Sequence, residues 1–239
     1  MDINIINNEK EFLAGKLEGY SLKGEENKFD NKGKPLPFPG CTIISNILLN
    51  TYLSNEISKF QKKIENFNPK ETYFYLPPSS YHMTLFDCCN INTENTNYWP
   101  ENIDQNLNYN QIAIELNKRL ENFVFPSELN MKLKMFYGGY SIVLEPFSEK
   151  DEIILRDCRN ELSKLLKIKF ENHQRYTFHI TLAYILRELE QYEIKKLLEF
   201  NKELFFEFNK KFPKIILSKP EMSTFENMLE FKSVNASNQ

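Results

Sequence analysis

One short pattern occurs twice in this chain of 239 residues. Tyr81-His-Met-Thr-Leu85 and Phe178-His-Ile-Thr-Leu182 share the order aromatic, His, apolar, Thr, Leu. The chain contains 3 histidines, and two of them open this His-apolar-Thr-Leu tetrad. By chance, a histidine is followed by such a triplet on the order of once in 500 cases. The repeat therefore indicates a duplicated unit with a pseudo-twofold arrangement, in which each half contributes an equivalent strand to a shared cleft.

Each tetrad has the pattern of a half-buried strand, because successive side chains of a strand point to opposite faces. His82 and Thr84 therefore share one face of the first strand, and His179 and Thr181 share one face of the second. The apolar residues between them face a core. Two such strands related by a twofold axis bring two imidazoles and two hydroxyls to one point.

This set of side chains suits the cleavage of a phosphodiester. One neutral imidazole can take a proton from the attacking water or hydroxyl, while a protonated imidazole gives one to the leaving oxygen. The unperturbed pKa of histidine, about 6.5, allows both forms and predicts optimal activity at about pH 6–7. Threonine hydroxyls can donate to the non-bridging oxygens. We therefore predict that His82, Thr84, His179 and Thr181 are catalytic, although the tetrads do not indicate which histidine is the acid.

A metal site built on the two histidines is the main chemical alternative. Metal hydrolases usually add carboxylates or a third histidine at a fixed spacing. Neither tetrad has a carboxylate on its His/Thr face, and Asp87 lies at the wrong parity to join them. The adjacent Cys88 and Cys89 lack Cys or His companions at a useful spacing, and the third histidine, His173, lies in a polar loop. We therefore expect no metal and no cofactor.

The remaining pattern of the chain predicts an α+β fold with two lobes, about 38–128 and 129–239, preceded by an N-terminal arm at 1–37. Antiparallel sheets are expected to form the central cleft, with helices outside. In the first lobe we expect strands at 41–45, 71–76 and 80–86, helices at 46–67 and 110–123, and a surface insertion at 88–110. In the second we expect strands at 131–136, 141–145, 176–186, 214–218 and 228–234, and helices at 149–166 and 188–209. The first two of these strands are joined at Gly138-Gly139, which is a hairpin signal.

The helix at 149–166 shows a helical apolar spacing. Its expected buried stripe consists of Ile153, Ile154, Cys158, Leu162, Leu165 and Leu166.

Charge and composition restrict the partners. The net charge is -3 and the pI about 5.8, whereas proteins that bind long duplex nucleic acid usually have a strong basic bias. The 7 glycines form no phosphate-binding loop motif. No apolar run reaches membrane-spanning length, and the N-terminus does not resemble a signal peptide. We expect a cytoplasmic protein with reduced thiols that acts on a small or short phosphate substrate and binds no membrane.

Four further residues are weaker candidates for substrate binding. Lys134 and Phe136 alternate with the apolar residues of their strand, so they are expected to face the cleft as a phosphate anchor and a stacking surface. Arg175 and Thr177 have the same parity as His179. The alternative for each is an ordinary exposed or packed residue.

The two tetrads resemble the paired H-Φ-[ST]-Φ motifs of the 2H phosphoesterase superfamily, which includes the LigT-like RNA cyclic phosphodiesterases. The interval between the two histidines is similar to the superfamily's usual one. Pro37-Phe-Pro-Gly-Cys-Thr42 and Leu76-Pro-Pro-Ser-Ser-Tyr-His-Met-Thr84 resemble a narrower, poorly characterised branch. The resemblance covers roughly residues 37–234.

The resemblance implies a metal-independent phosphodiesterase for a cyclic phosphate or short phosphodiester of a nucleotide or oligonucleotide. Cyclic dinucleotide signals and RNA ends with 2′,3′-cyclic phosphates are both possible substrates. The alternative is a non-catalytic nucleotide- or RNA-binding module with the same cleft. Intact His/Thr pairs in both halves favour the enzyme, because binding alone does not need two proton-transfer groups.

Overall fold

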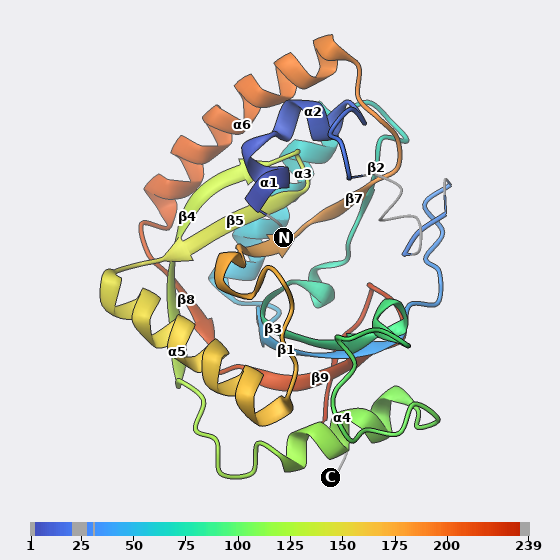
Figure 1. Ribbon diagram of the computed structural model, residues 1–239. Coiled ribbons are helices and arrows are strands. Elements are labelled where there is room, and N and C mark those ends of the chain that lie inside the picture. The colour runs from blue at the N-terminus through green and yellow to red at the C-terminus, as the bar shows by residue number, and fades with distance from the viewer. Residues whose placement is uncertain (1–2, 21–27, 31, 235–239) are drawn as a thin grey trace.

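A curled antiparallel sheet of eight strands organises the protein (Figure 1). The computed structural model describes residues 3–20, 28–30 and 32–234. In sheet order the strands are β10 (Lys232–Ser233), β9 (Glu221–Phe225), β1 (Gly40–Asn46), β3 (His82–Asn90), β6 (Phe178–Thr181), β5 (Ser141–Pro146), β4 (Glu128–Tyr137) and β8 (Ile215–Ser218). The sheet curls far enough for Ser45 of β1 to donate a hydrogen bond to the carbonyl oxygen of Ser218 in β8.

The predicted α+β class with antiparallel sheets is confirmed, but the two groups of four strands do not coincide with the two halves of the chain. They meet where β3 pairs with β6. The C-terminal strand β9 pairs with β1, and β10 pairs with β9, so the end of the chain completes the first group. A separate two-stranded sheet joins β2 (Tyr73–Tyr75) to β7 (Ala183–Ile185) and links the halves a second time.

Four longer helices cover the sheet: α3 (Tyr52–Phe67), α4 (Tyr109–Lys118), α5 (Glu149–Leu166) and α6 (Gln191–Lys211). Figure 1 shows α6 along the outside of β4 and α4 beside β9. Short 3-10 turns, η2 (Pro78–Ser80), η3 (Ile91–Thr93) and η4 (His173–Arg175), precede or follow the strands of the cleft.

The first part of the predicted arm is packed onto the sheet. It forms α1 (Ile3–Asn7) and α2 (Glu9–Leu13), and both Phe12 and Leu13 are buried beside Tyr137. Positions 21–27 of the arm lie outside the described residues.

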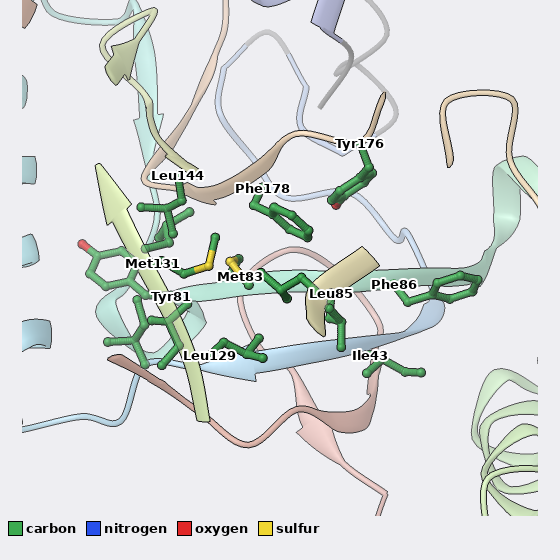
Figure 2. Packing of buried hydrophobic residues seen from close by; sticks show 14 of the residues in the cluster. Ile43, Tyr81, Met83, Leu85, Phe86, Leu129, Met131, Leu144, Tyr176 and Phe178 are labelled. Atoms are coloured by element: carbon green, nitrogen blue, oxygen red, sulfur yellow. The ribbon is translucent and has the colours of Figure 1, made fainter. Parts of the chain in front are cut away.

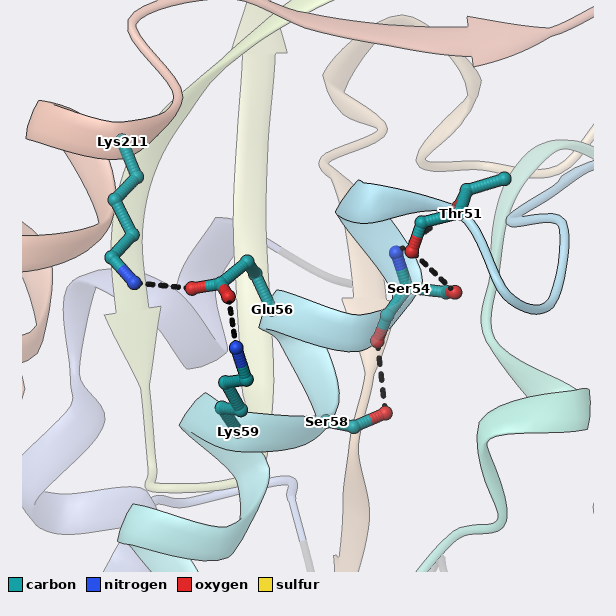
Figure 3. Close-up of polar contacts among 6 residues, drawn as sticks. All are labelled: Thr51, Ser54, Glu56, Ser58, Lys59 and Lys211. Carbon is teal, nitrogen blue, oxygen red and sulfur yellow. Dashed lines mark hydrogen bonds and ion pairs between the residues drawn. The ribbon is translucent and has the colours of Figure 1, made fainter.

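Helix α3 begins later than the predicted position 46, because β1 runs to Asn46 and the helix is capped at Thr51. The Ser54 amide donates to the Thr51 hydroxyl oxygen at 3.2 Å, which satisfies one of the free amides of the first turn (Figure 3). The buried carboxylate of Glu56 then accepts hydrogen bonds from Lys59 at 2.6 Å and from Lys211 at the end of α6. This ion pair joins α3 to α6.

Two predicted strands are wrong in extent. The one at 176–186 is broken at Leu182, whose carbonyl oxygen accepts hydrogen bonds from the Leu76 amide at 2.9 Å and the Gln61 side chain at 2.8 Å. The chain leaves the large sheet there and continues as β7. The one at 228–234 is reduced to β10, whereas 221–225, which was not predicted, forms β9.

The predicted bounds of α5 are confirmed, and Cys158, Leu162 and Leu166 are buried as predicted, but the rest of the buried face differs. Leu155 and Arg159 are buried, whereas Ile153 is 61% exposed. The polar Arg159 was not expected on this face.

The core under the two tetrads is apolar and tightly enclosed. Met83, Leu85 and Ile180 are all 0% exposed, as the predicted alternation requires. Figure 2 shows Met83 among side chains of β1, β4, β5 and β6, which are labelled Ile43, Leu129, Met131, Leu144 and Phe178. The curled sheet therefore holds the tetrad strands by packing on their inner face.

Ile180→Ala should lower the free energy of unfolding by about 2–5 kcal/mol, because it removes buried methylenes and leaves a cavity. Ile216→Ala is the matched control, since Ile216 is 52% exposed on β8 and its truncation should change stability by about 0.5 kcal/mol or less. Urea unfolding monitored by circular dichroism measures both. Equal effects of the two substitutions would contradict the packing described here.

Candidate active site

The register between β3 and β6 brings the two tetrads together. Met83 pairs with Ile180 in an antiparallel arrangement, so His82 lies across from Thr181 and Thr84 lies across from His179. The local twofold axis therefore passes through the Met83–Ile180 pair. Residues that are diagonal neighbours on one face of such a pair lie about 7–8 Å apart, which is the relation of the two histidines.

All four predicted catalytic residues line one cleft with a volume of about 410 Å³. His82, Thr84, His179 and Thr181 are each half-buried, whereas the apolar tetrad residues are buried. The structure thus places both His/Thr pairs on the same face of adjacent strands.

Both imidazoles are oriented by the same type of contact. The Nδ1 atom of His82 lies 2.7 Å from the carbonyl oxygen of Ser80, and Nδ1 of His179 lies 3.1 Å from that of Thr177. A carbonyl oxygen can only accept, so Nδ1 must carry the hydrogen in each ring. In the neutral state this leaves Nε2 of each ring as a proton acceptor.

Burial favours the neutral form of both rings. It lowers the pKa of His82 to about 4, although the hydrogen bond to Ser80 and the charge of Asp87 oppose this. Burial also lowers the pKa of His179 well below its usual value of 6.5, and the proximity of His82 adds to this effect. The site therefore holds two neutral imidazoles at pH 7 until an anion enters.

A bulge in β3 adds Asp87 to the cleft. Ile44 pairs with Thr84 and Ile43 pairs with Phe86, so Leu85 is the extra residue. Each bulge shifts the alternation by one position. Asp87 therefore returns to the face of Thr84 and lines the cleft. The expectation that Asp87 has the wrong parity was wrong for this reason.

The buried guanidinium of Arg159 supports the bulge. It donates a hydrogen bond to the carbonyl oxygen of Leu85, and another to that of His173 at 3.3 Å. It also lies 4.1 Å from the ring centroid of Tyr176, which lines the cleft. Burial, followed by the charge of Asp87, raises the pKa of Tyr176.

The structure does not place the four weaker candidates in the cleft. Phe136 was expected on the cleft face, but a bulge at Lys134 reverses the alternation. Phe136 is 2% exposed and packs against Phe60 and Phe208, so the prediction of a stacking surface was wrong. Lys134 and Arg175 are exposed and do not line the cleft, and neither does the buried Thr177. Thr177 contributes its backbone carbonyl to His179 instead.

Segments distant in sequence supply the remaining walls. Phe231, just before β10, packs against His82 with ring centroids 4.1 Å apart. Lys28 comes from the segment before β1, Asn90 lies at the far end of β3, and Tyr184 lies on β7. No local pattern in the sequence marks these residues, because each reaches the cleft only through strand pairing or a loop.

A cluster of three thiols lies behind one end of the cleft. Cys41 lies directly across from Cys89 in the β1–β3 pair, with the two sulfur atoms 3.5 Å apart, and both Cys41 and Cys88 line the cleft. Among the residues that the structure describes, no group of three or more His, Cys, Asp or Glu side chains is arranged to hold a metal ion. None of the described helices is long and apolar enough to cross a membrane.

Comparisons with known proteins give a family match over part of the chain and a shared fold. A family model described as "2H-phosphodiest: Domain of unknown function (DUF1868)" matches residues 28–138, which include the first tetrad. No curated protein sequence matches the chain. A solved structure of a conserved protein of unknown function from Agrobacterium tumefaciens strain C58 is similar, with a TM-score of 0.86. It is 20% identical in sequence, and the match covers 95% of this chain and 97% of that one, so it shows a shared fold.

Burial in the cleft predicts that both tetrad histidines are neutral at pH 7 in the free protein. A titration followed by the ¹⁵N and ¹H resonances of the imidazoles should give a pKa of about 4 for His82 and a value below 6.5 for His179. The ¹⁵N shifts should indicate the Nδ1–H tautomer in both. His173→Gln removes the third histidine signal and simplifies assignment. A pKa above 6.5 for either ring in the free protein would contradict the burial described here.

Proposed function

Because this chain belongs to the 2H phosphoesterase superfamily, we propose that it is a metal-independent phosphodiesterase that opens a cyclic phosphate or short phosphodiester of a nucleotide or oligonucleotide. The observation that carries the proposal is the pair of imidazoles on adjacent strands, each with Nδ1 bonded to a carbonyl oxygen and Nε2 left for the substrate. A cleft of about 410 Å³ suits a nucleotide or a short end of an oligonucleotide rather than a long duplex.

In the proposed reaction, Nε2 of one neutral imidazole accepts a proton from water as the water oxygen attacks phosphorus. The bond from phosphorus to the leaving oxygen breaks, and the second imidazole, protonated, gives its Nε2 proton to that oxygen. Each transfer contributes roughly 10²–10⁴-fold. Thr84 and Thr181 donate hydrogen bonds to the non-bridging oxygens, where negative charge must be held. The two rings exchange one proton with solvent to restore the starting state.

Binding of the anionic phosphate favours protonation of one of the two histidines. Both rings are neutral in the free protein, so one must gain a proton when the anionic substrate binds. A nearby negative charge stabilises the imidazolium and raises its pKa. The pseudo-twofold relation of the tetrads supports either assignment of acid and base.

His82→Ala and His179→Ala should each remove most turnover and leave the fold intact, because each deletes one proton-transfer group. Thr84→Ala and Thr181→Ala should each reduce kcat/KM by about 10- to 150-fold, which corresponds to about 1.5–3 kcal/mol for a hydrogen bond to a charged group. The measurement is turnover of nucleoside 2′,3′-cyclic phosphates, cyclic dinucleotides and RNA with a cyclic end, with and without EDTA.

Two results of these assays would overturn the proposal. Full activity of either histidine variant would exclude the paired acid–base role. Loss of wild-type activity on chelation, restored by zinc or manganese, would indicate a metal mechanism instead. Ile216→Ala serves as the control variant, because Ile216 is exposed on β8 and does not line the cleft.

The pH dependence should differ between kcat/KM and kcat. The profile of kcat/KM reports the free enzyme, in which burial lowers the pKa of both histidines, so it should already decline between pH 5 and 8. The profile of kcat reports the complex, in which the phosphate raises these values, and its optimum should lie at higher pH. Both profiles are measured from about pH 4 to 10 at constant ionic strength. A value of kcat/KM that climbs steadily to pH 10 would indicate hydroxide attack and contradict the mechanism.

A further inference from the structure

The cleft has an unusual charge balance for a site that binds phosphate. Among the described residues that line it, Lys28 and Asp87 are the ones that carry a full charge at pH 7, since burial keeps both histidines neutral. Lys28 lies over the rings of Phe38 and Tyr184, at 5.6 and 5.1 Å from their centroids. Among the described cleft-lining residues, hydroxyl and imidazole groups are therefore more numerous than cations.

The backbone of β3 fixes the position of the Asp87 carboxylate. The bulge at Leu85 turns Asp87 to the face that carries Thr84, and Arg159 secures the bulge through the Leu85 carbonyl oxygen. Asp87 is exposed to the cleft, and its neighbour across β1, Thr42, lines the cleft as well.

Asp87 is also close to the place proposed for the phosphate. Thr84 and Asp87 lie three residues apart on β3, and both line the cleft together with Tyr176. The charge of Asp87 also acts on the pKa of Tyr176 and of His82, so the carboxylate lies near the tetrad whose threonine would hold a non-bridging oxygen. The negative charge of the Asp87 carboxylate repels a phosphate bound there. Each additional negative charge on the ligand increases that repulsion, even at the dielectric constant of water.

We propose that Asp87 is a specificity-determining residue that excludes dianionic phosphates and thereby restricts the cleft to phosphodiesters with a single negative charge. The inference rests on the proposed function, in which a cyclic or linear phosphodiester binds between the tetrads. It also gives Asp87 a role in turnover. Opening a cyclic phosphate yields a phosphomonoester, whose second ionisation has a pKa of about 6, so the product becomes dianionic at neutral pH and is repelled.

The remaining groups around Asp87 do not reverse this effect. Among the described residues, the titratable or charged side chains near Asp87 are those of Tyr176, His82, Cys88 and Arg159. Burial raises the pKa of Tyr176, so this hydroxyl stays neutral. The guanidinium of Arg159 is 4% exposed and is bonded to two backbone carbonyls, which keeps it out of the cleft.

The test compares two probes that differ in phosphate charge and share the same nucleoside. Adenosine 2′,3′-cyclic phosphate is a monoanion, and adenosine 3′-monophosphate is a dianion above pH 6. Their dissociation constants are measured by calorimetry at pH 7.5 with the full-length wild-type protein, Asp87→Asn and Asp157→Asn. Asp157, exposed on α5 and absent from the cleft lining, is the matched control because its substitution removes the same charge.

In wild type the cyclic phosphate should bind more tightly than the monophosphate. In Asp87→Asn the affinity for the monophosphate, relative to the cyclic phosphate, should rise by about twofold or more, which is the effect of one unit charge about 8 Å away in water. Asp157→Asn should leave this ratio unchanged. The weakening of monophosphate binding between pH 5.5 and 7.5 should be larger in wild type than in Asp87→Asn.

The outcomes separate this inference from the proposed function. An unchanged affinity ratio in Asp87→Asn overturns the role of Asp87, even if the variant is thermally less stable because Asp87 offsets the charge of Arg159. A wild type that prefers the dianion, or that binds neither probe, overturns it as well. Tight binding of the cyclic phosphate with the expected ratios but without turnover supports the charge selection and refutes the phosphodiesterase. Turnover of the cyclic phosphate with an unchanged affinity ratio in Asp87→Asn supports the phosphodiesterase and refutes the charge selection by Asp87.

Discussion

The antiparallel pairing of Met83 with Ile180 is the contact on which the rest of the site depends. It joins the two groups of four strands, and it is the position through which the local twofold axis passes. Both residues are fully buried, so the apolar packing that fixes the register also fixes which side chains lie opposite one another on the other face. A slip of one residue would turn every histidine and threonine of one tetrad into the core. The geometry of the cleft is thus secured by the hydrophobic effect acting on the opposite side of the sheet.

The two halves are equivalent in their tetrads but not in their surroundings. Each imidazole is bonded through Nδ1 to a carbonyl oxygen two residues earlier in the chain. Near the first tetrad, however, a bulge turns the carboxylate of Asp87 toward the cleft, beside Tyr176. The buried Arg159 supports this bulge. We find no corresponding carboxylate on the second tetrad strand among the cleft-lining residues that the structure describes. The two tetrads are therefore related by a pseudo-twofold axis, whereas the charge of the surrounding cleft is not symmetric.

The low basicity of the histidines follows from the same construction. Packing both strands on an enclosed core places the rings in a poorly hydrated cleft, which disfavours the charged form. Among the cleft-lining residues that the structure describes, Lys28 is the one with a full positive charge at pH 7. An anionic ligand is then the strongest nearby influence on the protonation of the rings, so binding and proton transfer are coupled.

The sequence by itself determined the tetrads, the shared parity of His82 with Thr84 and of His179 with Thr181, the α+β class and the bounds of α5. These features depend on side-chain period within one element, which is local. Only the tertiary structure decided which strands pair, that β9 and β10 complete the first group, and where bulges interrupt the alternation. A bulge is a mismatch between two partner strands, so the pattern of one strand could not show that Asp87 faces the cleft or that Phe136 faces the core. The lowered pKa values of the two histidines were also decided only by the tertiary structure, because burial is a property of the assembled fold.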